Sequence, residues 1–308
     1  MRIVRCLVQM VLLLALLLVG GKLFAQGLAP YPDRPVRMIV PFAAGGGTDI
    51  TGRRFAAKLG TVLGQNILVD NRGGNDGAIG SAEAARAKPD GYTLLMGASS
   101  SHAIIPAMEK LPYDPVKDFA PVAVIGITPM VLVVHPEIAG TLQEFVAKAR
   151  ANPGKYGYGS TGTGGLVHLA GELLQKQAGI TITNVPYKGS GPGLQDLMAG
   201  HLPSMIATIS TVLAPHRAGK IRILAAFTAK RMVSAPDIPT AVEQGFPGVL
   251  AYTFNVLLAP AGTPAPVVER LYQATQKAVE DPALKKDLEA LGIEAVTDSS
   301  PAKARQFL

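Results

Sequence analysis

The sequence of 308 residues contains one cysteine, Cys6, and no tryptophan. Cys6 lies in an N-terminal segment that we expect to be removed, so the mature chain would carry no thiol and no disulfide. This excludes thiol catalysis, iron–sulfur clusters and cysteine-ligated zinc sites. No pair of histidines has the spacing of metal ligands and no H-E-x-x-H motif occurs, so we predict neither a metal nor a cofactor.

Aromatic and charged residues are also scarce, at 6% and 17% of the chain, and no run of lysine and arginine exceeds two residues. A stacking platform for bases is not expected, and we predict no nucleic-acid partner. Three of the 29 basic residues precede residue 26, so removal of that segment leaves a net charge of about +4. Such a weak positive charge suits small anionic ligands.

Residues 1–25 have the pattern of a secretory signal peptide. Arg2 and Arg5 precede an apolar run over residues 7–19, and Leu23-Phe24-Ala25 resembles a cleavage site that would be cut after Ala25. The run is shorter than the roughly 20 apolar residues of a membrane span. An uncleaved anchor helix is the alternative. We therefore predict an exported, periplasmic protein.

Beyond this segment, apolar runs typical of strands alternate with helical patterns. Thr141 and Glu144 form a capping box that begins a helix ending near Ala151. A long apolar stretch is broken at Thr128-Pro129. Alternation of this kind implies parallel sheets covered on both faces, and hence an α/β protein with two lobes. The predicted strands are 36–40, 67–69, 92–96, 121–125, 130–134, 156–160, 182–185, 205–209 and 221–226.

A glycine-rich loop lies between the first strand and the first helix. Consecutive backbone N–H groups and the positive end of the following helix would together form a cradle for an anion. Thr48 or Asp49 could cap that helix. A tight turn without a ligand is the alternative. The candidate ligand-binding residues here are Phe42, Ala44, Gly45, Gly46, Gly47, Thr48 and Asp49.

A second loop of the same design follows the strand 156–160 and precedes the next helix. Two such loops, one in each predicted lobe, favour one shared anionic ligand between them, held by amide groups of both. Neither loop completes a G-x-G-x-x-G, Walker A or G-x-S-x-G motif. The candidate residues are Ser160, Thr161, Gly162, Thr163, Gly164 and Gly165, with His168 one turn into the helix.

Two further segments place polar side chains after predicted strands. Ser99, Ser100 and His102 follow the strand 92–96, and Tyr187 with Lys188 follows the strand 182–185. His168 and His102 could donate hydrogen bonds to a ligand or to nearby carbonyl groups. The serines could point into a cleft or cap a helix. Lys188 could contact a carboxylate or lie in solvent.

Taken together, the motifs resemble the solute receptors of tripartite tricarboxylate transporters, also called Bug-type periplasmic binding proteins. The resemblance extends from about Tyr31 to the end of the chain. The motifs that carry it are YPDRPVRMIVPFAAGGGTDI, LVDNRGG, AIGSAEAARAKPDGYTLLMG, LPYDPVKDFAPV, KYGYGSTGTGG, VPYKGSGPGLQDLMAG, PDIPTAVEQGFPG and LAPAGTP.

The resemblance implies a two-lobe periplasmic binding protein fold, similar to type II, with the ligand cleft between the lobes and two crossover strands. We assign residues 26–127 and 251–308 to the first lobe and residues 128–250 to the second. The implied ligand is a small carboxylate, such as an organic acid, an acidic amino acid or an aromatic acid. The implied partners are the membrane permease subunits of the transporter, and we expect a monomer.

Several residues depart from the family pattern. Gly165 stands where serine is frequent, Pro203 where an acidic residue is frequent, and Phe254 where tryptophan is common. The last residues, Phe307 and Leu308, fall inside the last family helix, where the first lobe could lose packing. Two other functions stay open: an exported hydrolase or isomerase that uses His168 or His102 as a base, and a ligand sensor for a membrane kinase.

Overall fold

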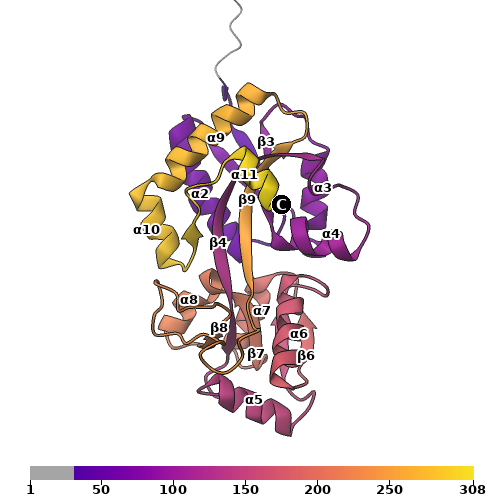
Figure 1. Ribbon diagram of the computed structural model, residues 1–308, viewed down its shortest axis with the longest axis vertical. Coiled ribbons are helices and arrows are strands. Elements are labelled where there is room, and N and C mark those ends of the chain that lie inside the picture. The colour runs from indigo at the N-terminus through magenta and orange to yellow at the C-terminus, as the bar shows by residue number, and fades with distance from the viewer. Residues whose placement is uncertain (1–30) are drawn as a thin grey trace, which may run out of the picture.

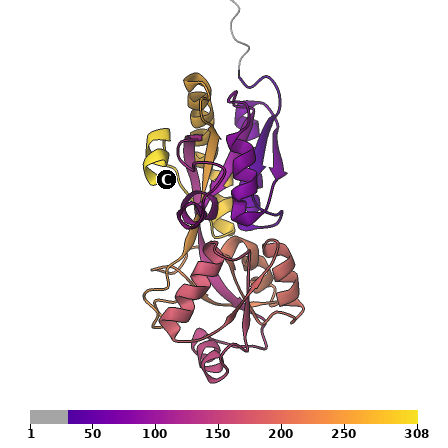
Figure 2. The same cartoon turned by 90° about the vertical axis from the view of Figure 1, so that its right-hand side faces the viewer.

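The computed structural model describes residues 31–308, so the predicted signal peptide and Cys6 lie outside the described residues. The chain forms two α/β lobes, one above the other in Figure 1, joined by the long strands β4 (Phe119–Val134) and β9 (Tyr252–Pro260). The view in Figure 2 shows the same two strands passing through the waist between the lobes. Within residues 31–308 no helix is long and apolar enough to cross a membrane.

The sheet of the first lobe is mixed rather than parallel. β1 (Val36–Val40) pairs in parallel with β2 (Ile67–Asn71) and β3 (Thr93–Ala98). β9 then joins β3 to β4 through two antiparallel ladders, which gives the order β2-β1-β3-β9-β4. A short strand, β10 (Glu294–Ala295), also pairs antiparallel with β4. The sequence prediction of purely parallel sheets is therefore wrong for the strands that join the lobes.

Helices cover both faces of this sheet because successive side chains of its strands point to opposite faces. Met38 and Val40 of β1 pack in a core with α2 (Gly47–Leu63), α9 (Ala265–Glu280) and α10 (Pro282–Ala290), whereas Ile39 packs in a second core with α3 and α11. The remaining elements of this face and of the cleft edge are α3 (Ala78–Ala85), α11 (Pro301–Phe307), η1 (Asn75–Gly77), η2 (Ser100–Ile104) and α4 (Ile105–Met108).

The second lobe repeats this layered design. From β4 the strands follow the order β7 (Ser204–Thr208), β5 (Gly157–Ser160) and β6 (Thr183–Pro186), and β8 (Arg222–Ala226) pairs with the other edge of β4. Met130, Leu132 and Val134 of β4 face a core with α5 (Leu142–Ala151) and α6 (Leu166–Ala178). Val131 and Val133 face another with α7 (Ser190–Met198) and α8 (Ile209–Arg217).

The strand β4 does not break where the sequence predicts. Pro129 lies in register opposite Tyr252 of β9, and the next residue, Met130, pairs with Thr208 of β7 in the second lobe. Proline cannot donate to a ladder. It is tolerated here because β4 exchanges its partners at this residue, so one strand of 16 residues serves both lobes. The segment that forms β9 was not among the strands predicted from apolar runs.

The predicted capping box at the start of α5 is confirmed. The Thr141 hydroxyl accepts a hydrogen bond from the Glu144 N–H at 3.1 Å. The Glu144 carboxylate accepts one from the Gly140 N–H at 2.7 Å. The first bond satisfies an amide group that the first turn of a helix leaves without a partner, and the second ties the residue before the N-cap to the helix.

The last helix, α11, packs on the first lobe. Ala304 is fully buried, and the Phe307 ring meets the Phe254 ring edge-on with centroids 4.9 Å apart. The hydroxyl of Ser299, just before this helix, accepts a hydrogen bond from the Val124 N–H of β4 at 2.8 Å. Phe254 thus contributes to the packing of this helix on β9.

Tyr158 fixes the position of α6 on the sheet of the second lobe. The side chain of Tyr158 on β5 is fully buried, and its hydroxyl donates a hydrogen bond to the His168 carbonyl at 3.2 Å. Gly171 of α6 lies directly against the Tyr158 ring, so close that a Cβ atom at this residue would overlap the ring. The absence of a side chain at Gly171 therefore lets the helix approach the sheet.

We expect Gly171→Ala to lower the free energy of unfolding by up to about 2 kcal/mol. The added methyl group overpacks the core at a cost of about 1–3 kcal/mol, and a gain of roughly 1 kcal/mol in helix propensity offsets part of this cost. Gly191→Ala in α7 is the matched control, since the nearest atom to its added Cβ is the Ala44 carbonyl oxygen at 3.9 Å. Urea denaturation measures both variants, and equal stabilities would contradict the assigned contact.

Candidate functional site

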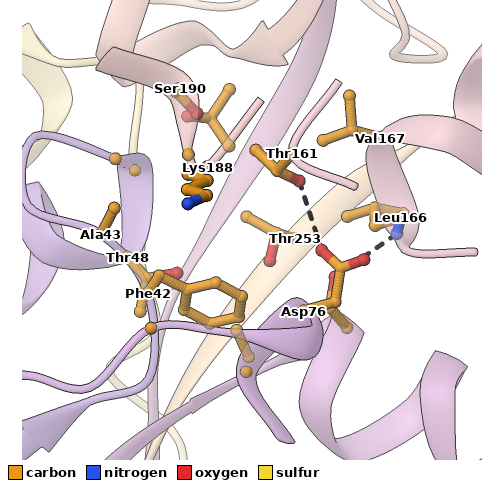
Figure 3. Close-up of a pocket in the computed structure, with 18 of the residues that line it drawn as sticks. Phe42, Ala43, Thr48, Asp76, Thr161, Leu166, Val167, Lys188, Ser190 and Thr253 are labelled. Atoms are coloured by element: carbon orange, nitrogen blue, oxygen red, sulfur yellow. Dashed lines mark hydrogen bonds between the residues drawn. The ribbon is translucent and has the colours of Figure 1, made fainter. Parts of the chain in front are cut away.

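A cavity of about 570 Å³ lies between the two lobes, and Figure 3 shows its lining. The amino ends of α2 from the first lobe and of α6 from the second both border it. The structure thus brings the two glycine-rich loops to one cavity. Of the residues proposed from the sequence, those that line it are Phe42, Gly46, Gly47, Thr48, Ser100, Thr161, Tyr187 and Lys188.

The other proposed residues lie behind this lining or beside it. In the first loop, Ala44 and Gly45 are exposed and Asp49 is buried. In the second loop, only Thr161 reaches the cavity surface. The proposed residues that do not line the cavity are Ala44, Gly45, Asp49, Ser99, His102, Ser160, Gly162, Thr163, Gly164, Gly165 and His168.

Asp49 holds the first loop together rather than facing the cavity. Its carboxylate accepts hydrogen bonds from the Gly45 N–H at 2.9 Å, the Asn71 amide at 2.9 Å and the Arg53 guanidinium at 3.0 Å. Burial by itself would raise the pKa of Asp49, but these hydrogen bonds outweigh it and hold the pKa below its ordinary value. The negative charge of Asp49 is therefore satisfied within the first lobe.

The amino end of α2 has no side-chain cap. Gly46 occupies the N-cap position in an extended conformation and offers no side chain to the first turn. Uncapped first-turn N–H groups and the helix dipole make this end attractive to an anion. The Thr48 hydroxyl accepts a hydrogen bond from the Asn255 amide of β9 at 3.2 Å, which fixes it beside the cavity.

The same end of α2 touches the second lobe. Gly47 packs against the side chain of Thr208, and a Cβ atom at Gly47 would overlap the Thr208 hydroxyl. Nearby, a Cβ atom at Gly189 would lie 2.6 Å from the Ala43 Cβ. The lobes are thus in contact across the cavity, and glycine allows the close approach at both contacts.

The amino end of α6 is occupied by a carboxylate of the first lobe. The Thr161 hydroxyl lies 3.3 Å from Asp76 Oδ1, and the Gly165 backbone N–H donates to the same carboxylate. Figure 3 shows the carboxylate directed at Thr161 and at the start of α6. A Cβ atom at Gly165 would overlap the Asp76 carboxylate. The absence of a side chain at Gly165 therefore leaves room for Asp76.

Other partners complete the hydrogen bonds of this second loop. The Gly164 N–H donates to His168 Nδ1 at 3.1 Å, and the Leu166 N–H donates to the Ser100 hydroxyl of the first lobe at 3.4 Å. The Ser160 hydroxyl donates to the Gly162 carbonyl at 2.8 Å. The sequence predicted a loop whose amides bind a ligand, whereas in the structure the amides of Gly162, Gly164, Gly165 and Leu166 are bonded to the protein itself.

Asp76 was not among the residues proposed from the sequence. It lies in η1, where Asn75 and Asp76 have φ angles of 43° and 45° between two glycines that also have positive φ. Asn and Asp tolerate this left-handed conformation better than other non-glycine residues. The available signal was the run Gly74-Asn75-Asp76-Gly77, a strong turn pattern with one carboxylate in it.

The environment of Asp76 raises the pKa of its carboxyl group. Burial raises the pKa of Asp76 to about 6, while the hydrogen bond from Thr161, the nearby His168 and the hydrogen bond from Gly165 act in the opposite direction. Desolvation disfavours the charged carboxylate, and it outweighs these favourable contacts. Asp76 therefore titrates well above the ordinary range of an aspartate.

The two proposed histidines make structural contacts. His168 Nδ1 is an acceptor for Gly164, so a neutral ring carries its proton on Nε2, which lies 3.6 Å from Glu172. His102 is buried, and burial lowers the pKa of its imidazole to about 3. Its Nδ1 lies 2.9 Å from the Ser101 hydroxyl. Neither ring lines the cavity as a general base would.

The remaining candidates divide between scaffold and cavity wall. The Ser99 hydroxyl accepts a hydrogen bond from the Phe254 N–H of β9 at 2.9 Å, which uses it within the first lobe. The Tyr187 hydroxyl donates to Asp196 at 2.8 Å while Tyr187 lines the cavity. Lys188 is exposed at the cavity edge. Across residues 31–308, no three histidine, cysteine, aspartate or glutamate side chains are grouped to hold a metal ion.

A cavity between two α/β lobes, bordered by two helix amino ends and joined by two shared strands, is the architecture of periplasmic solute-binding proteins. Comparison with known proteins agrees. The family model "Tripartite tricarboxylate transporter family receptor" matches residues 51–307, and the chain belongs to that family. The predicted two-lobe fold and the resemblance to Bug-type receptors are thereby confirmed.

Individual relatives cover nearly the whole chain. BugT of Bordetella pertussis (strain Tohama I) is 35% identical over 281 residues, which are 90% of this chain and 86% of BugT. MatC from Rhodopseudomonas palustris, solved with bound malate, has a TM-score of 0.84 at 32% identity and covers 90% of this chain and 96% of MatC. An R. palustris protein solved with adipate has a TM-score of 0.85 at 33% identity, with 90% and 93% covered. These family assignments make the chain a receptor and not an enzyme.

The raised pKa of Asp76 predicts a pH-dependent stability difference between wild type and Asp76→Asn. A folded-state pKa of about 6, against an ordinary 3.8, means that wild type loses stability as the pH rises from 4 to 7. The uncharged Asn side chain has no such loss. We expect the variant to gain about 2 kcal/mol over wild type across this interval.

Guanidinium denaturation of both proteins at pH 4, 5, 6 and 7 measures this difference. Asp49→Asn is a control of opposite sign, because the lowered pKa of Asp49 stabilises the folded protein once the pH exceeds its ordinary value. That variant should lie below wild type by a nearly constant amount from pH 5 to 7, because the contribution of Asp49 is lost only as the pH falls below about 4. A gap between wild type and Asp76→Asn that stays constant with pH would contradict the assigned environment.

Proposed function

We propose that this protein captures a small organic carboxylate in the cavity between its lobes and delivers it to the membrane permease subunits of a tripartite tricarboxylate transporter. The observation that carries the proposal is the uncapped amino end of α2, whose first-turn residues Gly47 and Thr48 line the cavity. Backbone amides at such an end bind an anion without a cationic side chain. Malate and adipate in the solved relatives are acids of this kind.

The energetics support micromolar binding. Each charge-assisted hydrogen bond contributes roughly 1.5–3 kcal/mol, so two or three at α2, together with apolar contact to the cavity wall, approach the ~8 kcal/mol of a micromolar dissociation constant. Phe42, Leu166 and Val167 supply such apolar contact. Lys188 at the cavity edge adds a positive charge that attracts the acid toward the site.

In this proposal the two lobes close on the ligand. The first lobe consists of residues 26–127 and 251–308, and the second consists of residues 128–250. The strands β4 and β9 join them and act as the hinge. The mature protein would be a monomer in the periplasm after cleavage behind Ala25. Mass spectrometry of the exported protein tests the cleavage, and sedimentation tests the monomer.

Isothermal titration calorimetry of the mature protein against a panel of small mono- and dicarboxylates tests the proposed ligand class. At least one acid should bind with a dissociation constant in the micromolar range or below, and the uncharged amide of that acid should not bind. If every acid in the panel fails to bind, the proposal of a carboxylate receptor is wrong.

For any acid that binds, we expect Gly47→Ala to weaken affinity at least tenfold. The added methyl group would overlap the Thr208 hydroxyl, so the lobes could not close at the amino end of α2. Adding Thr208→Gly to this variant removes the overlap and should restore most of the affinity. Calorimetry of the single and double variants measures both effects, and a Gly47→Ala affinity equal to wild type would argue against the α2 site.

A further inference from the structure

The cavity contains one acidic and one basic side chain. Among the described residues that line it, Asp76 and Lys188 are the only members of the Asp, Glu, Lys and Arg set. Lys188 is exposed at the edge, whereas Asp76 is largely buried at the contact between the lobes. The two helix amino ends that border the cavity therefore differ. At α6 the Asp76 carboxylate of the other lobe accepts hydrogen bonds at the amino end of the helix. At α2 the first-turn carboxylate, Asp49, accepts from Gly45, Asn71 and Arg53 instead.

Asp76 occupies the place that a second ligand carboxylate would take. Its oxygens receive hydrogen bonds from the Thr161 hydroxyl and the Gly165 N–H, and no space for another carboxylate remains between Asp76 and Gly165. A ligand carboxylate near α6 would meet the charge of Asp76 instead of free amide donors. Like charges at about 6 Å in the protein interior correspond to roughly a 100-fold loss of affinity.

We propose that Asp76 determines the ligand class: the receptor takes a monocarboxylate whose other end carries a hydrogen-bond donor, a hydroxyl or an amino group, and rejects dicarboxylates of the same length. The ligand carboxylate binds at α2, and its donor faces Asp76. This inference rests on the proposed function, since it assumes that the cavity binds a carboxylate at α2.

The acceptor capacity of Asp76 fits this assignment. An ionised carboxylate can accept about four hydrogen bonds, and the protein supplies two. Asp76 also lines the cavity, so its remaining lone pairs are accessible to a ligand. A hydroxyl or ammonium group placed there gains a charge-assisted hydrogen bond, which is stronger than a bond between neutral groups.

The loop that presents Asp76 is held in its conformation. Asn75 and Asp76 adopt left-handed backbone angles that most side chains disfavour. The Asn75 amide donates to Glu109 at 2.6 Å, and the Gly77 N–H donates to the Gly74 carbonyl at 3.1 Å. The left-handed turn therefore keeps the carboxylate directed at α6 when a ligand enters.

Matched acids test the proposal by calorimetry at pH 7.5. Succinate is compared with 4-hydroxybutanoate and 4-aminobutanoate, and adipate with 6-hydroxyhexanoate and 6-aminohexanoate. Within each set only the terminal group differs. For wild type we expect a hydroxy or amino acid of at least one length to bind at least tenfold more tightly than the matched dicarboxylate.

Two substitutions of Asp76 separate its charge from its volume. Asp76→Gly suits the left-handed backbone, removes the carboxylate and frees Thr161 and Gly165 for a ligand. It should raise dicarboxylate affinity at least 100-fold and reverse the preference. Asp76→Asn removes the charge but keeps the volume of the side chain, so it should recover at most the roughly 100-fold electrostatic loss. Asp237→Asn, at an exposed residue outside the cavity, is the control for net charge and should keep the wild-type preference.

The outcomes are distinguishable. If wild type binds dicarboxylates at least as tightly as the matched hydroxy and amino acids, or if Asp76→Gly leaves the preference within threefold of wild type, the role of Asp76 is wrong although a carboxylate receptor stands. If neither wild type nor Asp76→Gly binds any of these acids, the carboxylate receptor fails and this inference fails with it. Circular dichroism confirms that each variant is folded.

Discussion

The positive amino ends of two helices, brought to one cavity from different lobes, are the constraint on which the rest of this structure depends. Gly46 before α2 and Gly165 before α6 provide no capping side chain, so the first-turn amides need another anion. At α6 the protein supplies that anion through Asp76. At α2 no side-chain cap is present, and we propose that an anion from solution takes this place.

The fold brings these ends together through strands that belong to both lobes. β4 pairs with β9 up to Pro129 and with β7 and β8 beyond it, so the two sheets share one continuous strand at the waist. The lobes touch where the side chains are smallest, at Gly47 against Thr208 and at Gly189 against Ala43. Bulkier residues at these positions would hold the lobes apart. The glycines at positions 47 and 189 are therefore needed for the lobes to approach each other this closely.

Local patterns in the sequence predicted most helices and strands, but they did not predict every strand pairing or every contact between distant residues. The strand 36–40 and the capping box at Thr141 depend on neighbouring residues, and both were predicted correctly. The continuity of β4 through Pro129 depends on a change of pairing partner, which no local window records. Likewise, both glycine loops were visible in the sequence, whereas the carboxylate at the second comes from Asp76, 85 residues before Thr161. Such a contact exists only after the lobes have folded and met.

The carboxylate of Asp76 also changes the energetics of closure. Without it, closing the lobes with no ligand would bury the donors of α6 unpaired, which costs more than leaving them in water. With Asp76 in place these donors have a partner. Closing the lobes without a ligand therefore costs less free energy. A ligand shifts the open–closed equilibrium only by its difference in affinity between the two states. Under the proposed ligand selection, that difference arises at the α2 end and at the lone pairs of Asp76, and one side chain would then link ligand selection to lobe closure.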